Sequence, residues 1–485
     1  MEWSLFCRGK ASDASLALAA LSEAIDLACT ETEFSLLRLT AKILRKRQPL
    51  PAACNIPTIA ARLLQNEPIR VVFVNDNGVH AGAGIGLKRQ AQAFAQAGHE
   101  IHIIALNSDD HMVTQCFYEF RTWLDANDLN VNLHLVPKPR AVNCSGQFIF
   151  TDFFRQFTFA DGLPTLYIVG NLHSWPISPG FIPWLMSKDI AFIFYAHDLD
   201  WISGGCAYPQ YYDCTRYLSQ EGCTNQSCPM PDHAYPTSAR RRKTANYAFR
   251  DIVISTNQLP IVTNSSWTTK HFQARYPECQ LIHEAEYGLD TDRFFASKEI
   301  YKSRRRRLNL PESTLAVAIG ADDDSRPGKG SHHLKVIMNA LAEQEDIVFL
   351  SFGHSSLEGA NIIKFGYSSD ERRMASVFQC ADIFLNMATI DCFGQVTIEA
   401  ASCGCVPIVL AGTGTEAAVE NHRNGIVVAD IKEAIRVISH LAKDRRLLSA
   451  LSESAAEYTQ NKYSLGQEYI RWIHCLSSIG ARSIP

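Results

Sequence analysis

The sequence has 485 residues, which is long enough for two domains and too long for one ordinary hydrophobic core. Hydrophobic residues make up 46% of the chain and charged residues 20%, which indicates a packed protein and excludes wholesale disorder. The formal net charge of -4 gives no global attraction to nucleic acid.

The first segment, residues 1–66, is rich in Ala, Leu and Glu. Its apolar residues have the spacing of amphipathic helices, in ASLALAALSEAIDLA and again in EFSLLRLTAKILRK. We therefore predict a helical extension over residues 1–66 that packs on the protein or docks a partner.

From residue 69 onward, short apolar runs alternate with amphipathic stretches, as in parallel sheets that are covered by helices. One series contains IRVVFV, EIHIIAL, TLYIVG and IAFIFYAH. The second contains LAVAIG, DIVFLSFG, ADIFLNM, VPIVL and GIVVA. The pattern predicts an α/β protein with two Rossmann-like, doubly wound domains and a cleft between them. The predicted domains are residues 67–300 and 301–465, followed by a C-terminal helix, 466–485, that packs back on the first domain.

A glycine-rich segment, NDNGVHAGAGIG, follows the first apolar run and precedes an amphipathic stretch. A glycine-rich turn entering a helix brings backbone N–H groups and the helix dipole close to phosphate oxygens. A tight structural turn or a dinucleotide fingerprint are the alternatives, although the spacing differs from the standard dinucleotide pattern.

Two carboxylates, Asp391 and Glu399, lie in the segment ADIFLNMATIDCFGQVTIEAASCGCVPIVL. The segment predicts a strand, a loop and a helix, with one carboxylate in the loop and the other in the helix. Such carboxylates can accept paired hydrogen bonds from vicinal hydroxyls, while Phe393 and Gly394 turn backbone N–H groups toward phosphate. The spacing alone is equally typical of two unrelated acids.

The whole segment resembles the signature of the GT-B glycosyltransferases of family four, which is Glu-x-Phe-Gly, four residues, and Glu-Ala. Here Asp391 replaces the leading Glu and has one methylene fewer. Three further segments match the family in the same order: GAGIG with its helix, GLDTDRF at 288–294, and GKG at 328–330.

The resemblance implies a GT-B fold in which residues 67–300 bind the acceptor and residues 301–465 bind a nucleoside diphosphate sugar. It also implies a retaining hexosyltransferase. Glu399 would hold the ribose, Asp391 the sugar hydroxyls, and Lys329 with Arg326 the diphosphate, because fixed cations stabilise a departing phosphate. The catalytic residues that the resemblance implies are His173, Asp391 and Lys329. The donor-binding set is Gly82, Gly84, Ile85, Arg326, Lys329, Gly353, Asp391, Phe393, Gly394, Gln395, Val396 and Glu399.

Two histidines follow consecutive apolar runs of the first domain, His173 in IVGNLHSWP and His197 in FYAHDLDW. By resemblance, His173 lies near the transferred sugar, where it would position the acceptor or stabilise charge. His197 is a second candidate for the cleft, and a structural, hydrogen-bonded histidine is the alternative.

An insert over residues 201–230 contains Cys206, Cys214, Cys223 and Cys228. It resembles a cysteine-bearing insert in bacterial polysaccharide-building members of the family. Four thiols over a short stretch could form a structural zinc site, with buried thiols or a disulfide as the alternatives. No cofactor is expected to be required for catalysis.

The chain is expected to be cytoplasmic, because it has no apolar stretch of membrane-spanning length and its N-terminus lacks a basic start followed by an apolar block. The 15 cysteines are then expected to be thiols or metal ligands, because the cytosol is reducing and the count is odd. The expected acceptor is a saccharide or a lipid-linked glycan. Two basic runs, 240–243 and 304–307, would either touch an anionic membrane or form solvated faces. A sugar-nucleotide epimerase of the same fold and a catalytically silent binding protein are the alternative functions.

Overall fold

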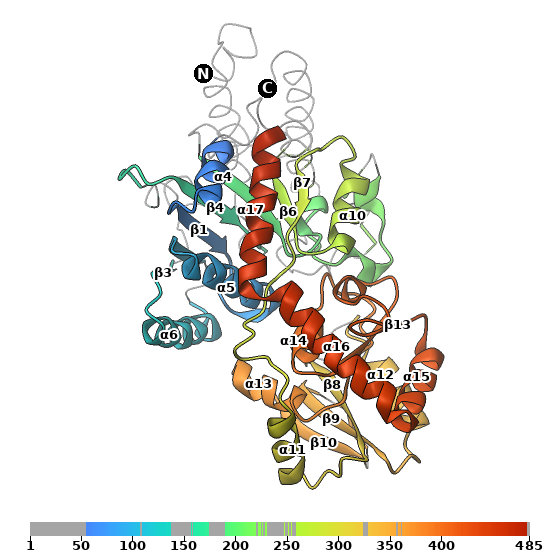
Figure 1. Cartoon of the computed structure of the whole chain (residues 1–485). Helices are drawn as coiled ribbons and strands as arrows, with labels where there is room; N and C mark the ends of the chain where they lie inside the picture. Colours follow the sequence, from blue (N-terminus) through green and yellow to red (C-terminus); the bar gives the residue numbers. More distant parts are fainter. Residues whose placement is uncertain are drawn as a thin grey trace, which may run out of the picture. The chain divides into compact units, whose positions relative to one another are not determined.

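The computed structural model divides into two compact units (Figure 1). Unit 1 comprises Met1–Asn264, Thr268–Ala285 and Tyr469–Pro485, and unit 2 comprises Ser265–Trp267 and Glu286–Glu468. The structure describes residues 55–106, 109–136, 157, 159–173, 190–219, 222–224, 226, 228–229, 247, 251, 254, 259–323, 328–355, 357–359 and 361–482. Most of the expected helical extension, the basic run 240–243 and Arg326 lie outside the described residues.

Among its described residues, unit 1 contains one seven-stranded sheet with the order β3-β2-β1-β4-β5-β6-β7, and all neighbouring strands are parallel. The central strands β1 and β5 are buried at every position, which explains why they are continuous apolar runs. The strands are β1 (Arg70–Asn75), β2 (Glu100–Ala105), β3 (Val131–Leu135), β4 (Thr165–Val169), β5 (Ala191–Ala196), β6 (Ile261–Thr263) and β7 (Ile282–Glu284).

The helices of unit 1 alternate with these strands. They are α4 (Ile56–Leu64), α5 (Ala81–Gln96), α6 (His111–Ala126) and α10 (Ser266–Arg275), with short 3₁₀ turns η1 (Asp200–Ile202), η2 (Pro209–Tyr212) and η3 (Arg216–Leu218). Helix α6 begins after Asp110, whose carboxylate accepts hydrogen bonds from the N–H groups of Met112 and Val113.

Unit 2 contains a second parallel sheet, with the order β10-β9-β8-β11-β12-β13 among its described residues. Its strands are β8 (Leu315–Asp323), β9 (Ile347–His354), β10 (Ile362–Gly366), β11 (Ile383–Asn386), β12 (Val406–Leu410) and β13 (Ile426–Val428). Its helices are α11 (Lys298–Arg307), α12 (Ser331–Ala340), α13 (Glu371–Phe378), α14 (Gln395–Ser402), the 3₁₀ turn η5 (Gly414–Ala418), α15 (Ile431–Lys443) and α16 (Arg445–Tyr463). Both expected series of strands, and with them the predicted α/β class, are confirmed.

The last helix, α17 (Leu465–Arg482), has its first four residues in unit 2 and the remainder in unit 1. In Figure 1 this red helix crosses in front of the strands of unit 1. The buried ring of Trp472 packs against Phe94 of α5 and Tyr195 of β5, with ring centroids 5.8 and 5.5 Å apart. The Tyr469 hydroxyl forms a hydrogen bond with His99 Nε2 at 2.7 Å.

The glycine-rich segment differs from its prediction. Gly82 and Gly84 lie inside the first turns of α5 and not in a turn before it, because the left-handed residue Ala81 (φ 60°) already begins the helix. Gly84 packs tightly, since a Cβ there would lie 2.6 Å from the carbonyl carbon of Val79. Ile85 follows in the same helix.

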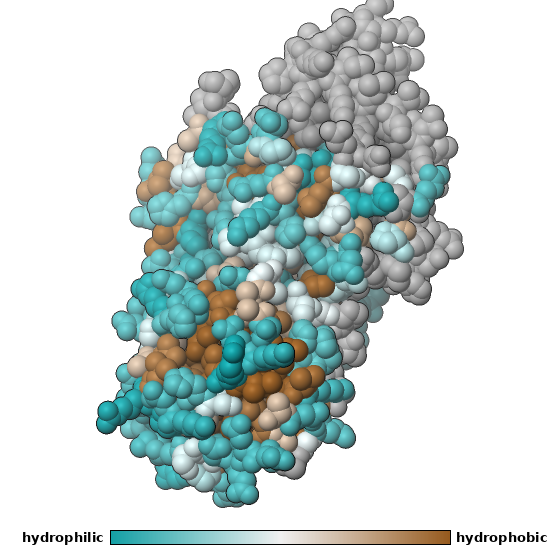
Figure 2. All heavy atoms as spheres, turned by 90° about the vertical axis from the view of Figure 1, so that its right-hand side faces the viewer, coloured by the Kyte–Doolittle hydropathy of each residue, from teal (hydrophilic) through white to brown (hydrophobic). Residues whose placement is uncertain are grey.

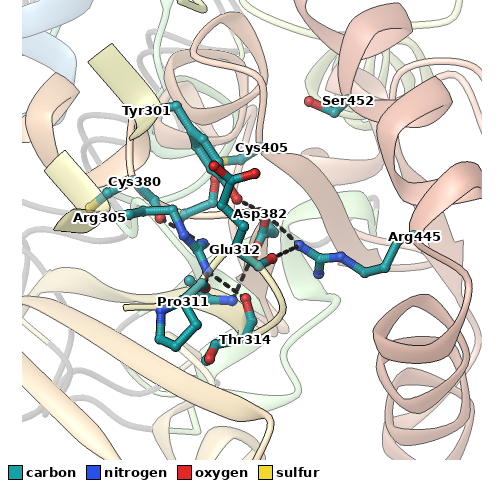
Figure 3. A network of polar contacts seen from close by, with 12 residues as sticks. Tyr301, Arg305, Pro311, Glu312, Thr314, Cys380, Asp382, Cys405, Arg445 and Ser452 are labelled. Carbon is teal, nitrogen blue, oxygen red and sulfur yellow. Dashed lines mark hydrogen bonds and ion pairs between the residues drawn. The ribbon is translucent and has the colours of Figure 1, made fainter. Parts of the chain in front are cut away.

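The second basic run is not a linker, because it forms the last turn of α11. Arg305 is 1% exposed and donates to the Asp382 carboxylate at 3.0 Å (Figure 3). Asp382 also accepts from the Tyr301 hydroxyl at 2.7 Å and from the N–H of Ala316 at 2.8 Å. Arg305 is therefore a structural group of unit 2 that is not exposed to a lipid surface.

The face of the molecule in Figure 2 is largely hydrophilic, with hydrophobic residues gathered on part of unit 2. The exposed large apolar side chains of unit 2 include Val336 and Leu447. Isolated exposed apolar residues are ordinary in globular proteins. Within the described ranges, no helix is long and apolar enough to cross a membrane.

Candidate functional site

In unit 2, Asp391 lies in the loop between β11 and α14 and forms a tight turn. Its Oδ1 accepts hydrogen bonds from the N–H groups of Phe393, at 3.2 Å, and Gly394, at 3.1 Å. Gly394 caps α14 with φ 78°, a conformation that favours glycine. The N–H groups that we expected to point at phosphate therefore donate to this carboxylate.

The other oxygen of Asp391 is paired with Lys329, whose Nζ lies 3.2 Å from Oδ2. Lys329 belongs to the Gly-Lys-Gly segment between β8 and α12. The carbonyl of Gly328 accepts from the N–H of Thr389 at 2.8 Å, and a Cβ at Gly330 would lie 2.0 Å from the Met387 carbonyl. Glycine is thus required at residue 330, and the loops after the adjacent strands β8 and β11 are held together.

The pair keeps Asp391 ionised. Burial alone would raise the pKa of Asp391, but the Lys329 ammonium and the two backbone N–H groups outweigh burial and lower the pKa below its ordinary value. The side chains of Lys329 and Asp391 are 26% and 22% exposed. A fixed cation and a fixed carboxylate at the same strand ends can bind a phosphate and sugar hydroxyls side by side.

Of the other predicted donor residues, four lie in unit 2, whereas Gly82, Gly84 and Ile85 lie in α5 of unit 1 and Arg326 lies outside the described residues. Glu399 is buried in α14, and Gln395 and Val396 are half-buried in its first turn. Gly353 lies near the end of β9 with φ 79°.

The loop that supports Asp391 was not predicted from the sequence. The N–H of Gly414 donates to the Asp391 carbonyl at 2.8 Å, and a Cβ at Gly414 would lie 2.2 Å from that oxygen. The buried side chain of Thr415 packs on Gly394. The available signal was the Gly-Thr-Gly-Thr segment, residues 412–415, directly after the apolar run VPIVL.

Unit 1 has a second polar cluster, at the carboxyl ends of β4 and β5. His173 Nε2 lies 3.3 Å from Asp198 Oδ2 and 3.9 Å from Asp200 Oδ2. Asn171 Nδ2 donates to the same Asp198 oxygen at 3.2 Å, and the N–H of Asp200 donates to Asp198 Oδ1 at 2.8 Å. His197 lies beside Gly170, where a Cβ would be 2.7 Å from its Nε2.

The two histidines of this cluster have opposite protonation. Burial alone would lower the pKa of His173, but the carboxylates of Asp198 and Asp200 outweigh burial and raise the pKa to about 10. Burial lowers the pKa of His197 to about 3. At neutral pH, His173 is therefore a buried cation that cannot accept a proton, and His197 is neutral.

Only the histidines of this cluster were predicted from the sequence. Asp76, Asn171, Asp198 and Asp200 each follow an expected apolar run by a few residues. Parallel strands bring such residues to one edge of a sheet, so position after a strand was the signal that could have found them.

At the four cysteines of the insert, the described residues support the free-thiol alternative and give no support for zinc. All are thiols, and the described part of the chain contains no group of three His, Cys, Asp or Glu side chains that could hold a metal ion. Other contacts hold this loop, because the buried Tyr217 hydroxyl is bonded to His271 Nδ1 at 2.8 Å and the Ser203 hydroxyl accepts from the N–H of Cys206 at 2.7 Å.

Solved structures similar to this chain define its fold class. Anabaena HepE in complex with UDP and glucose has a TM-score of 0.57 and 14% identity, over 84% of this chain and 100% of that chain. Sucrose-phosphate synthase from Thermosynechococcus elongatus has a TM-score of 0.59 and 15% identity, over 85% and 100%. WaaG, a glycosyltransferase involved in lipopolysaccharide biosynthesis, has a TM-score of 0.51 and 14% identity, over 82% and 98%. The fold is GT-B, as predicted.

The sequence comparison covers the second half of the chain. Residues 332–473 match a family model described as glycosyl transferase-like. The matched segment contains Asp391 and Glu399. No curated protein matches the chain. The chain thus combines the GT-B fold with a glycosyl transferase-like segment, and together they support a glycosyltransferase.

Proposed function

We propose that this protein is a retaining hexosyltransferase of family four that moves a sugar from a nucleoside diphosphate sugar to an acceptor hydroxyl. The observation that carries the proposal is the Lys329–Asp391 pair, which two glycine-dependent loops fix beside the N-terminus of α14. The pair lies at the carboxyl ends of parallel strands, where α/β sheets bind ligands. The family and the retention of configuration rest on the resemblance of the signature segment.

In the proposed reaction, Lys329 and Arg326 neutralise the diphosphate as it departs. An ammonium group has three N–H donors, so Lys329 can contact phosphate while it holds Asp391 in place. Asp391 accepts hydrogen bonds from the sugar, and Glu399 from the ribose. His173 acts as a cation or a hydrogen-bond donor, since its raised pKa excludes it as a base at neutral pH. No metal is required.

UDP-sugars are the first donors to test, because HepE, a protein of the same fold, was solved with UDP-glucose. The proposed acceptor is a saccharide or a lipid-linked glycan, the pathway is surface polysaccharide synthesis, and the compartment is the cytoplasm. The acceptor and the pathway rest on the resemblance of the cysteine-bearing insert, and the compartment is the one expected from the sequence.

The test is a thermal-shift and transfer assay of the full chain with UDP-, GDP- and ADP-sugars. A donor at 100 times its Kd should stabilise the folded protein by about 2.7 kcal/mol. We expect Glu399→Ala to abolish the shift. We expect Lys329→Met to lower kcat by about 100-fold, and the exposed Lys335→Met to leave kcat unchanged.

Each alternative function gives a different result in this assay. Epimerisation of the donor sugar without an acceptor would identify an epimerase. Donor binding without any turnover would identify a silent binding protein. Absence of a shift with every donor would contradict the proposal.

A further inference from the structure

Two buried side-chain carbonyl oxygens, one of Asn171 in the polar cluster of unit 1 and one of the adjacent Asn75, have no hydrogen-bond donor among the described residues. Asn75 and Asn171 are 1% and 7% exposed. Asn75 Nδ2 donates to the Gly78 carbonyl at 2.9 Å, and Asn171 Nδ2 donates to Asp198 at 3.2 Å. The Gly78 carbonyl and the Asp198 carboxylate only accept hydrogen bonds, so the side-chain NH₂ group of each asparagine must face them. The remaining polar atom of each side chain is therefore its oxygen, Oδ1. Within the described part of the chain, neither Oδ1 has a hydrogen-bond partner.

These two oxygens belong to one location. Asn75 ends β1 and Asn171 follows β4, which is adjacent to β1 in the sheet. The N–H of Asp76 donates to the Asn171 carbonyl at 2.8 Å, so the two loops are directly bonded. A Cβ at Gly170 would lie 3.4 Å from Asn75 Oδ1. The order of the strands reverses between β1 and β4, and ligands bind at such switch points.

The charges at this location are predominantly negative. The carboxylates of Asp198, Asp200 and Asp76 each raise the pKa of His173. His197 is neutral, because burial lowers its pKa to about 3. A buried acceptor without a donor is unfavourable, so a ligand that supplies donors to these oxygens is stabilised there. A ligand that supplies a carboxylate or a phosphate meets further acceptors and like charge.

We propose that this cluster, formed by Asn75, Asn171, Asp198 and Asp200, binds the acceptor through hydroxyl or ammonium donors. The sugar that it takes is neutral or amine-bearing, and uronic acids and sugar phosphates are excluded. This inference rests on the proposed transferase function and adds the chemical class of the acceptor.

The experiment measures saccharide binding to the full chain in the absence of donor, by saturation-transfer NMR. The probes are the methyl glycoside, the 2-amino sugar and the uronic acid of glucose and of galactose. We expect the neutral or amino sugar of at least one series to bind about 10-fold or more tightly than its uronic acid, which corresponds to about 1.4 kcal/mol.

Two variants separate recognition from a structural effect. Asp200→Asn removes one charge at nearly constant shape and should reduce the preference for the amino sugar over the uronic acid several-fold. Asp125→Asn, at an exposed residue of α6, is the matched control and should leave this ratio unchanged. A ratio is used because a general loss of stability weakens all probes alike.

Tight binding of the uronic acids, or equal ratios in the two variants, would overturn the proposal. So would an absence of binding by all six probes. UDP binding is measured on the same samples, so that a failed acceptor proposal with an intact donor site is distinguished from failure of the transferase function itself.

Discussion

His173 and His197 show how buried residues near the same carboxylates can be tuned in opposite directions. Burial lowers the pKa of His173, but the charges of Asp198, whose Oδ2 lies 3.3 Å from the ring nitrogen, and of Asp200 together outweigh burial. His197 is buried as deeply, but the Asp198 charge does not outweigh burial there, so its pKa falls to about 3. Their contributions to stability must therefore depend on pH in different ranges.

The pKa of His173 is about 10 in the folded protein and about 6.5 in the unfolded chain. Its stabilising contribution is complete below pH 6.5 and is lost as the pH rises toward 10. We therefore expect the stability difference between wild type and His173→Gln to shrink between pH 6.5 and 9.5, by up to about 1 kcal/mol per pH unit. Urea unfolding across this range measures it.

His197→Gln is the control, because the lowered pKa of His197 places its contribution above pH 6.5 and its loss between pH 6.5 and 3. Its stability difference from wild type should stay constant between pH 6.5 and 9.5. Parallel profiles for the two variants would show that His173 is not held as a cation.

At Asp391, charge and geometry can be separated by substitution. Asp391→Asn keeps an oxygen for the N–H groups of Phe393 and Gly394 but loses the charge that pairs with Lys329. We expect kcat/KM to fall about 100-fold with a loss of stability within about 1 kcal/mol.

Asp391→Glu has the opposite effect on the turn. Its extra methylene carries the carboxylate past the N–H groups two and three residues ahead, so this variant should lose about 1 kcal/mol, the usual cost of a lost cap. The exposed Asp370→Asn, at the start of α13, serves as the control for activity. Full activity in Asp391→Asn would show that the negative charge has no part in the reaction.

At the scale of elements, the sequence predicted most of the strands that are buried on both faces. Strands β1, β5 and β12 are mostly apolar because helices cover both faces of the sheet. The strands β3, β7 and β10 were missed because they are sheet edges with mostly half-exposed or exposed residues. The buried strand β6 was missed because it has only 3 residues. A continuous apolar run is not required at an edge, so no such run was present to detect.

The basic turn of α11 could not be interpreted from sequence, because four consecutive arginines suggest solvent and only the packing shows that one is buried. We expect Arg305→Met to cost about 3 kcal/mol, since it removes the nearer of the two arginines that pair with the buried Asp382 carboxylate and leaves only Arg445, 3.5 Å away. Arg306→Met, at an exposed neighbour, should cost less than about 0.5 kcal/mol. Denaturant unfolding of both variants measures this, and equal costs would contradict the network in Figure 3.

At the scale of the whole molecule, the chain returns to unit 1 through α17 after completing unit 2. Which site residues meet likewise depends on how strands that are distant in the sequence pair in the sheet. The polar residues of the unit 1 cluster lie at the ends of strands or just after them in the sequence. Strands β1 and β4 are neighbours only because β2 and β3 lie on the other side of β1. Sequence position identifies such residues, and the strand order determines which of them meet.

Trp472 is the residue through which we expect α17 to stabilise unit 1. Its ring is fully buried between Phe94 and Tyr195, and truncation of a buried tryptophan costs about 3–5 kcal/mol. Trp472→Ala should therefore accelerate hydrogen exchange of the slowest amides in β1, β4 and β5 by about 100-fold or more. The amides of β8, β9 and β11 should exchange as in wild type, because Trp472 contributes to the core of unit 1 and not to that of unit 2. Ile470→Ala, at an exposed residue of the same helix, controls for a change in helix propensity. Equal acceleration in both sheets would instead show that the two units unfold together and that α17 stabilises the molecule as a single cooperative structure.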